Sequence, residues 1–153
     1  MPDRTTPYGA FNFLVNLNSQ GVDPDSPLGG FSDVSGIGSE VTIAEYRTGN
    51  EKENHVRKVP GVHKVSDVTL KRGIVDSKSL FDWIKETRTT GVNAKKKSVT
   101  ITLHDEAQTK VESWILANVI PMKYTGPTLA AKGGGDVAME ELVLAAEGMV
   151  IEK

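Results

Sequence analysis

Alternating apolar and polar residues predict a protein built mainly from β-strands. Every second residue from Phe11 to Leu17 is apolar, and asparagine occupies two of the three positions between them. A period of two places such residues on one face of a strand. Similar alternation, less regular toward the C-terminus, predicts strands in five further segments: EVTIAEYR (40–47), VSDVTLKRG (65–73), SVTITLHD (98–105), KVESWILANVI (110–120) and AMEELVLAAEGMVI (138–151).

One segment follows the helical period instead. Its apolar stripe consists of Leu80, Phe81 and Ile84, with Trp83 beside it. The pair Asp76-Ser77 can cap the first turn, because a short side-chain oxygen accepts hydrogen bonds from free amides there. The helix is expected to end by Gly91 and to pack on a sheet. One helix among several strands predicts a mainly β (α+β) fold, organised as a single domain over residues 1–153.

The composition argues against several classes of protein. The chain has 153 residues, no cysteine and a net charge of −2, with a pI of about 5.9. The absence of cysteine rules out disulfides and thiolate chemistry, and the weak negative charge argues against a broad nucleic-acid surface. No apolar run approaches ~18 residues, so no membrane span is expected. The first residues lack the basic and apolar regions of a secretory signal, so a cytoplasmic place of folding is expected.

Candidate catalytic and metal-binding residues are few and scattered. The glycines 133–135 follow a lysine, but they lack the spacing of a phosphate-binding loop and are interpreted as a turn. Adjacent carboxylates at 105–106 and 140–141 point to opposite faces of a strand, so neither pair forms an acid–base pair. Metal-ligand spacing is absent from the three histidines, His55, His63 and His104. We therefore predict no catalytic, cofactor-binding or metal site, and no enzyme activity.

The segment 47–63 is the most unusual part of the sequence. It is long and charged, contains Pro60-Gly61, and separates a strand ending near Arg47 from one expected to begin at Val65. Strands are usually joined by a few residues, and a long polar loop on a rigid scaffold commonly serves binding. We interpret it as an extended assembly loop that contacts another copy of the protein. The predicted subunit-interface residues are Arg47, Asn50, Glu51, Lys52, Glu53, His55, Arg57 and Lys58.

Several blocks of the sequence resemble the contractile phage tail tube protein family, which also supplies the inner tubes of contractile injection systems. The block 55–84 combines a basic-Val-Pro-Gly turn, a strand reading VTLKRG, and a helix with Leu-Phe-x-Trp-Ile. Further blocks follow in family order: YGAFNFLVNL (8–17), GGFSDVSGIGSEVTIAEYR (29–47) and GDVAMEELVLAAEGM (135–149). Many relatives have Asn-Asp after the late glycine and a His before the final Glu-Gly, where this chain has Gly135-Asp136 and Ala146.

The resemblance implies an antiparallel β-sandwich or small barrel with one flanking α-helix. Six copies of such proteins form a ring, rings stack into a rigid hollow tube, and strands of all subunits join a ring-wide β-barrel. The implied partners are further copies of the chain, a sheath protein, baseplate or spike adaptor proteins, and luminal cargo, which is DNA, a tape-measure protein or a toxin. Assembly in the bacterial cytoplasm would precede incorporation into a virion tail or a released extracellular particle. Polar positions expected to face the channel are Asn12, Asn16, Thr100, Thr102, Glu112 and Asn118.

Two alternatives stay open at this point. The first is a tube-initiator or adaptor protein between spike and tube, which would form a single ring rather than extended stacks. The second is a monomeric enzyme or ligand-binding module with the same kind of small barrel. A chain that stays monomeric at high concentration and binds a ligand saturably would support the second alternative.

Overall fold

The computed structural model describes residues 4–18, 31–74, 79–91, 97–133 and 135–153. Within these residues the chain forms nine strands and one helix, α1 (Ser79–Thr90), which lies between the fifth and sixth strands. The strands are β1 (Phe13–Asn18), β2 (Asp33–Ser35), β3 (Ser39–Tyr46), β4 (Arg57–Val65), β5 (Val68–Gly73), β6 (Lys97–His104), β7 (Lys110–Thr125), β8 (Met139–Ala145) and β9 (Gly148–Glu152). The predicted mainly β (α+β) fold is confirmed.

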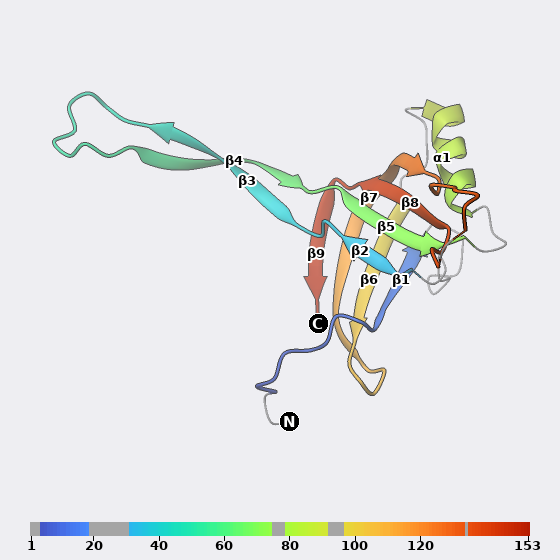
Figure 1. The fold of residues 1–153 in the computed structure, drawn as a ribbon. Coiled ribbons are helices and arrows are strands. Elements are labelled where there is room, and N and C mark those ends of the chain that lie inside the picture. The colour runs from blue at the N-terminus through green and yellow to red at the C-terminus, as the bar shows by residue number, and fades with distance from the viewer. Residues whose placement is uncertain (1–3, 19–30, 75–78, 92–96, 134) are drawn as a thin grey trace.

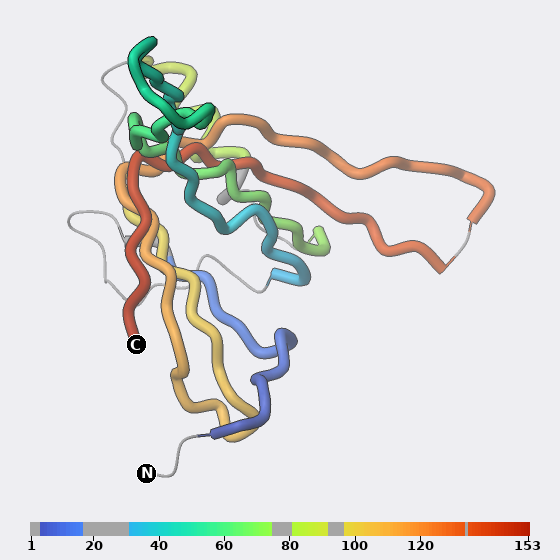
Figure 2. The backbone as a smooth tube through the Cα atoms, turned by 90° about the vertical axis from the view of Figure 1, so that its left-hand side faces the viewer, coloured from blue at the N-terminus to red at the C-terminus, as the bar shows by residue number. Residues whose placement is uncertain are grey.

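Seven strands form one antiparallel ladder that folds into two layers (Figures 1 and 2). The long strand β7 belongs to both layers, because its first part lies between β6 and β9 while its second part pairs with β8. It bends near Asn118, whose φ is 52°, and its register with β6 shifts there. We call β1-β6-β7-β9 the first layer and β7-β8-β5-β2 the second layer.

Side chains from both layers meet in one core. Val15 and Ile101 are cross-strand partners in the first layer, and Leu70 and Leu142 are cross-strand partners in the second. All four are almost completely buried and belong to one contiguous cluster. Each such side chain contributes roughly 1.5–3 kcal/mol when buried. The arrangement agrees with the expected sandwich, and the described strands do not close into a barrel within one chain.

A buried ion pair joins the two central strands of the second layer. Arg72 on β5 and Glu140 on β8 are direct cross-strand partners, and both are buried. Arg72 Nε donates a hydrogen bond to Glu140 Oε1, and the Tyr124 hydroxyl donates to Glu140 Oε2 at 2.8 Å. Burial, followed by the contact with Glu140, raises the pKa of Tyr124. A one-residue slip between β5 and β8 would break these contacts, so the network favours a single register.

The helix packs against β7 through Trp83, which is only 4% exposed. The expected stripe is therefore partly wrong, because Phe81 is 42% exposed and Ile84 is only half-buried. The indole of Trp83 supplies the buried contact, and Phe81 packs edge-on against Tyr124 of β7, with the ring centres 5.6 Å apart. The side chain of Leu80 and the predicted cap Asp76-Ser77 lie outside the described residues.

Two strand predictions need correction. Residues 138–151 were expected to form one strand, but they form β8 and β9, which are separated at Ala146-Glu147. The interruption lies opposite the bend in β7, and the Glu147 amide donates to the Ala117 carbonyl at 3.0 Å there. The partner strand must bend where β7 bends. Strand β2 was not predicted, because its three residues are too short to show alternation.

Replacing Trp83 tests the attachment of the helix. We expect Trp83→Ala to lower the free energy of unfolding by about 3–5 kcal/mol, because it leaves a cavity between α1 and β7. Trp83→Phe should cost much less, since it keeps most of the apolar contact and removes an indole N–H that is buried without a hydrogen-bond partner. Urea unfolding of the unassembled chain measures both. Equal losses for the two variants would contradict this account.

Candidate assembly surface

A two-stranded ribbon projects from the body of the protein (Figure 1). Its strands β3 and β4 pair only with each other among the described strands, in a register that runs from Ser39–Val65 to Tyr46–Arg57. The ribbon continues the β2–β5 pair of the second layer, and the Ser66 amide donates to the Gly38 carbonyl at 3.0 Å where the two meet. We call residues 39–65 the hairpin.

The expected loop at 47–63 is shorter than the sequence indicated. Residues 47–56 connect the strands, but residues 57–63 belong to β4, and Val65 ends this strand rather than beginning one. Pro60-Gly61 was taken to interrupt regular structure. Pro60 instead lies opposite Ile43, next to a shift in register. Because the outer edge of β4 is unpaired, the missing amide of proline costs no ladder hydrogen bond.

The hairpin exposes apolar side chains that no part of the described chain covers. All eight residues of β3 and eight of the nine residues of β4 are exposed. The exposed apolar residues of the two strands are Val41, Ile43, Tyr46, Val59 and Val62. An isolated two-stranded ribbon is marginally stable in water, and grouped exposed apolar residues mark an interaction surface. The hairpin is therefore the candidate assembly surface.

The total surface of the chain leads to the same conclusion. The chain exposes 10,945 Å², whereas a compact monomer of its mass would expose about 7,500 Å². The excess has the size that permanent assemblies bury in their interfaces. Such a surface is expected of a subunit rather than of an independent monomer.

The tip of the hairpin gathers the eight predicted interface residues. Several of them hold the tip together: Glu51 pairs with Arg57 at 3.0 Å, and His55 pairs with Glu53 at 3.2 Å. Arg47 donates to the Asn54 side chain at 3.2 Å. No such contact is found within the described chain for Asn50, Lys52 and Lys58. Their contact with another subunit stays a prediction.

The apolar part of this surface is not predicted from the sequence. Val59 is 49% exposed and Val62 is 77% exposed, yet both were placed inside a charged loop. The available signal was the recurrence of valines at 56, 59 and 62 among charged residues, which is unusual for a solvated loop.

The root of the hairpin depends on Gly36. Its φ is +84°, a conformation that side chains with a Cβ rarely adopt. A Cβ at this position would lie 2.2 Å from the carbonyl oxygen of Asp67. The close approach of these two backbone segments sets the direction in which the ribbon leaves the second layer.

The face of the first layer that points away from the core is largely uncharged and mixed, since Leu14 and Ile115 lie on it beside its polar residues. Asn16, Thr100 and Thr102, three of the positions expected to face a channel, share this face, as does Ser113. Thr102 and Ser113 are nevertheless buried within the single chain, and their hydroxyls lie 3.2 Å apart. The prediction that Glu112 faces the channel is wrong, because Glu112 pairs with Leu103 on the face of the layer that points toward the core.

Asn12 and Asn118 contribute little to that face. The side chain of Asn12 donates to the Asp105 carbonyl at 3.4 Å, next to the β6–β7 turn. Asn118 lies at the bend in β7 and donates to Glu147 Oε2 at 3.0 Å. Both asparagines have local structural contacts.

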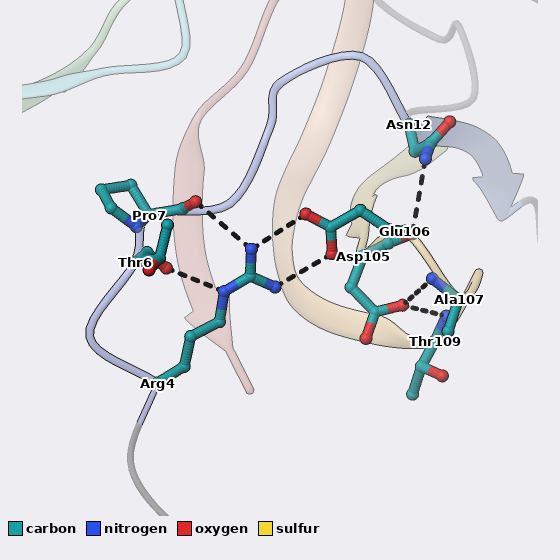
Figure 3. Close-up of polar contacts among 8 residues, drawn as sticks. All are labelled: Arg4, Thr6, Pro7, Asn12, Asp105, Glu106, Ala107 and Thr109. Carbon is teal, nitrogen blue, oxygen red and sulfur yellow. Dashed lines mark hydrogen bonds and ion pairs between the residues drawn. The ribbon is translucent and has the colours of Figure 1, made fainter.

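The N-terminal segment is fastened to the β6–β7 turn (Figure 3). Arg4 donates two hydrogen bonds to the carboxylate of Glu106, at 2.9 and 3.0 Å, and its guanidinium lies 4.1 Å from the centre of the Tyr8 ring. Asp105 Oδ1 accepts from the amides of Ala107 and Thr109, which fixes the turn. The hydrogen bond from Arg4 lowers the pKa of Glu106 to about 2.

Other kinds of site find little support. Among the described residues, no three His, Asp or Glu side chains are grouped so that they could bind a metal ion. The described part of the chain also contains no helix that is long and apolar enough to cross a membrane.

A mainly β domain with an uncovered ribbon and a large surface excess defines a self-assembling structural subunit. The family model of the T4-like virus tail tube protein gp19 matches residues 9–150. The chain belongs to this tail tube protein family. No curated protein sequence matches the chain.

Solved structures show the same fold in injection particles. A chain of the PVC sheath–tube complex, an extracellular contractile injection system in its extended state, is 28% identical, with 97% of this chain and 93% of that chain covered and a TM-score of 0.80. A chain in the tube-terminating cap of the anti-feeding prophage is 26% identical, with 99% and 94% covered and a TM-score of 0.81. Hcp1 from Flavobacterium johnsoniae, at 13% identity, 90% and 94% coverage and a TM-score of 0.51, shares the fold alone.

Substituting Gly36 tests the root of the hairpin. We expect Gly36→Ala to destabilise the chain by about 1–3 kcal/mol, because the alanine is strained at positive φ and its Cβ meets the Asp67 carbonyl. Gly49→Ala is the matched control, since nothing lies within 4 Å of a Cβ there, and it should change stability by no more than about 0.5 kcal/mol. Thermal unfolding compares them. Equal stability of the two variants would rule out the proposed constraint.

The contact between Arg4 and Glu106 predicts a pH dependence. Because folding lowers the pKa of Glu106 from 4.5 to about 2, the contact stabilises the fastened N-terminal segment above pH 4.5, and this contribution is lost as the pH falls through about 2. An NMR titration of the Glu106 carboxyl should give the low value, and Arg4→Gln should raise it toward 4.5. An unchanged titration in Arg4→Gln would contradict the assignment.

Proposed function

We propose that this chain forms the inner tube of a contractile tail or injection particle, through six-membered rings of identical subunits that stack end to end. The observation that carries the proposal is the hairpin, a ribbon with uncovered faces and edges that only another molecule can cover. Membership of the tail tube family and the likeness to a chain of a sheath–tube complex support this interpretation.

Within a ring, the first layer supplies two free edges for closure. Strand β1 ends the ladder on one side, and β9 lies beyond β7 on the other. An edge of β1 that meets the β9 edge of the next copy is a head-to-tail contact, and repetition of such a contact closes a ring without leaving open edges. The apolar face of this layer is already buried in the core. Its opposite face, on which the half-buried Asn16 and Thr100 lie, would then line the channel.

Between rings, the hairpin provides a projecting contact. Each of its strands extends roughly 3.3 Å per residue, so the eight residues of β3 carry the tip well beyond the body. Its apolar residues supply the affinity, because burial removes them from water. Its charges set register and exclude wrong partners more than they add affinity.

The remaining parts of the proposal follow from this role. The subunit performs no chemical step, and a sheath protein supplies the driving energy around it. Baseplate or spike adaptor proteins contact one end of the tube, and the channel carries DNA, a tape-measure protein or a toxin. The chain assembles in the bacterial cytoplasm and functions as part of a virion tail or released particle.

The alternative is an adaptor that forms one ring at the end of the tube. The likeness to a chain of the anti-feeding prophage cap keeps this alternative open. Negative-stain electron microscopy and analytical ultracentrifugation of the purified chain separate the two. Extended stacks support the tube subunit, and single rings that never stack support the adaptor. A chain that stays monomeric when sheath and baseplate proteins are supplied would overturn both.

Removing hairpin charges tests the stacking contact. Lys58 and Lys64 lie opposite Glu45 and Glu40, and neither lysine forms an ion pair within the described chain. We expect Lys58→Gln with Lys64→Gln to shift tube formation to several-fold higher protein concentration, since each exposed charge pair contributes about 0.2–1 kcal/mol. Reversal to Glu is avoided, because like charges would then lie opposite each other within the hairpin.

The matched control removes the same charge from the helix, with Lys85→Gln and Arg88→Gln, and should assemble like the parent in the absence of sheath protein. Sedimentation of tubes over a concentration series measures the shift. An unchanged concentration threshold for the hairpin variant, or an equal shift for the control, would contradict the role of these charges.

A further inference from the structure

We infer that the hairpin of one copy docks into an apolar cavity beside β2 of a neighbouring copy, with Val62 as the inserted side chain. This inference rests on the proposed tube function and names the receptor for its stacking element. The cavity has a volume of about 270 Å³ and lies between the two layers. Its walls are mainly apolar and include Phe13, Ile37 and Trp114.

The occupant follows from the inventory of exposed apolar side chains. Phe11 neighbours Ala10, which lines the cavity, so it belongs to the receptor side. Val137 lines a groove on the other side of Asp33, between the β7–β8 connection and the second layer. Val150 and Ile151 on β9 and Leu129 in the β7–β8 connection are exposed as well, but the hairpin has the largest group, five exposed apolar residues on its two strands. Val62 is the most exposed of these five at 77%.

Charge complementarity favours the same occupant. Asp33 lies at both the cavity and the adjacent groove, and Asp136 lines the groove. Neither carboxylate forms an ion pair within the described residues. On the hairpin, Lys64 lies two residues after Val62 and therefore on the same face of β4. A valine seated in the cavity brings this lysine toward Asp33 and Asp136, whose groove also contains Lys71, and the opposite charges favour one orientation.

Backbone groups beside the cavity also suit an extended occupant. Strand β2 ends the ladder of the second layer, so its outer edge is unpaired among the described strands. The outer edges of β3 and β4 are unpaired in the same sense. An extended segment laid along a free edge gains main-chain hydrogen bonds, while alternate side chains enter pockets on either side.

The geometry makes the contact intermolecular. Val62 belongs to β4, which projects from the body (Figure 1), whereas the cavity is lined by residues of β1, β2, β6 and β7. Donor and receptor are different surfaces of the same chain, so the contact is head-to-tail. Such a contact propagates from copy to copy rather than ending in a closed pair.

Engineered thiols test the inference, because the chain has no cysteine of its own. Val62→Cys combined with Ser32→Cys places one thiol on the hairpin and one on the rim of the cavity. Roughly ten residues of extended strand separate the two positions within one chain, so a disulfide, which needs Cα atoms within about 7 Å, forms only between copies. Tubes of this variant, mildly oxidised, should run as a ladder of multimers on a non-reducing gel.

The control pairs Val62→Cys with Lys85→Cys on the helix, and its tubes should run as monomers. Ala10→Cys is a second receptor position if the Ser32 variant fails to fold or assemble. As an independent arm, Val62→Asp should lower the tube yield at least tenfold with an unchanged circular dichroism spectrum.

The outcomes separate this docking site from the tube function itself. Tubes that give only monomers with both receptor cysteines, or ladders equal to those of the control, overturn the docking site and leave the tube function intact. Undiminished tubes from Val62→Asp overturn the role of Val62. A parent chain that forms no tubes overturns both proposals.

Discussion

The organisation of this molecule depends on the pairing of β5. Within the body, β5 is hydrogen-bonded on both edges, by β8 and by β2, and its buried side chains belong to the core. The preceding strand β4 has a partner on one edge only, and it carries apolar residues on a ribbon that its own chain cannot cover. One continuous stretch of chain thus passes from a ribbon that the described residues leave uncovered into a fully paired strand of the body. The proposed stacking contact follows from this uncovered ribbon.

Apolar contacts and charges have different roles when another copy covers the hairpin. Exposed charge pairs are screened by solvent and individually contribute little, so the ionic contacts at the tip hold the turn in shape rather than drive association. Valine, isoleucine and tyrosine side chains gain more free energy when water is removed. Their exposure in a single copy indicates that the folded subunit and the assembled particle are two stages of one burial process.

The strands of the body could be predicted from the sequence because each buries one face. In β1 and β6 the alternation is regular, and both strands were found close to their observed bounds. Prediction failed where neighbours decide the structure. Pro60 and Gly61 signal a turn by themselves, yet they lie in β4 because the free edge tolerates proline. Trp83 could not be ranked above Phe81 in the helix, because only the position of β7 determines which side is covered.

One part of the candidate surface could be predicted from neighbouring residues in the sequence, and another part could not. The charged tip was visible from composition, and all eight predicted residues lie there. The cavity beside β2 was not, since its walls come from segments that are distant in the sequence, such as Phe13 and Trp114. No spacing rule connects such positions before the layers are assembled.

One strand gives the subunit a mechanical property. Because β7 runs through both layers, one continuous backbone joins the wall of the proposed channel to the second layer, and backbone hydrogen bonds through β8 and β5 connect it to the base of the projecting ribbon. A longitudinal load applied through the ribbon reaches β5 and β8 and then β7, where it acts on a continuous backbone. The subunit can thus transmit thrust without one layer sliding over the other.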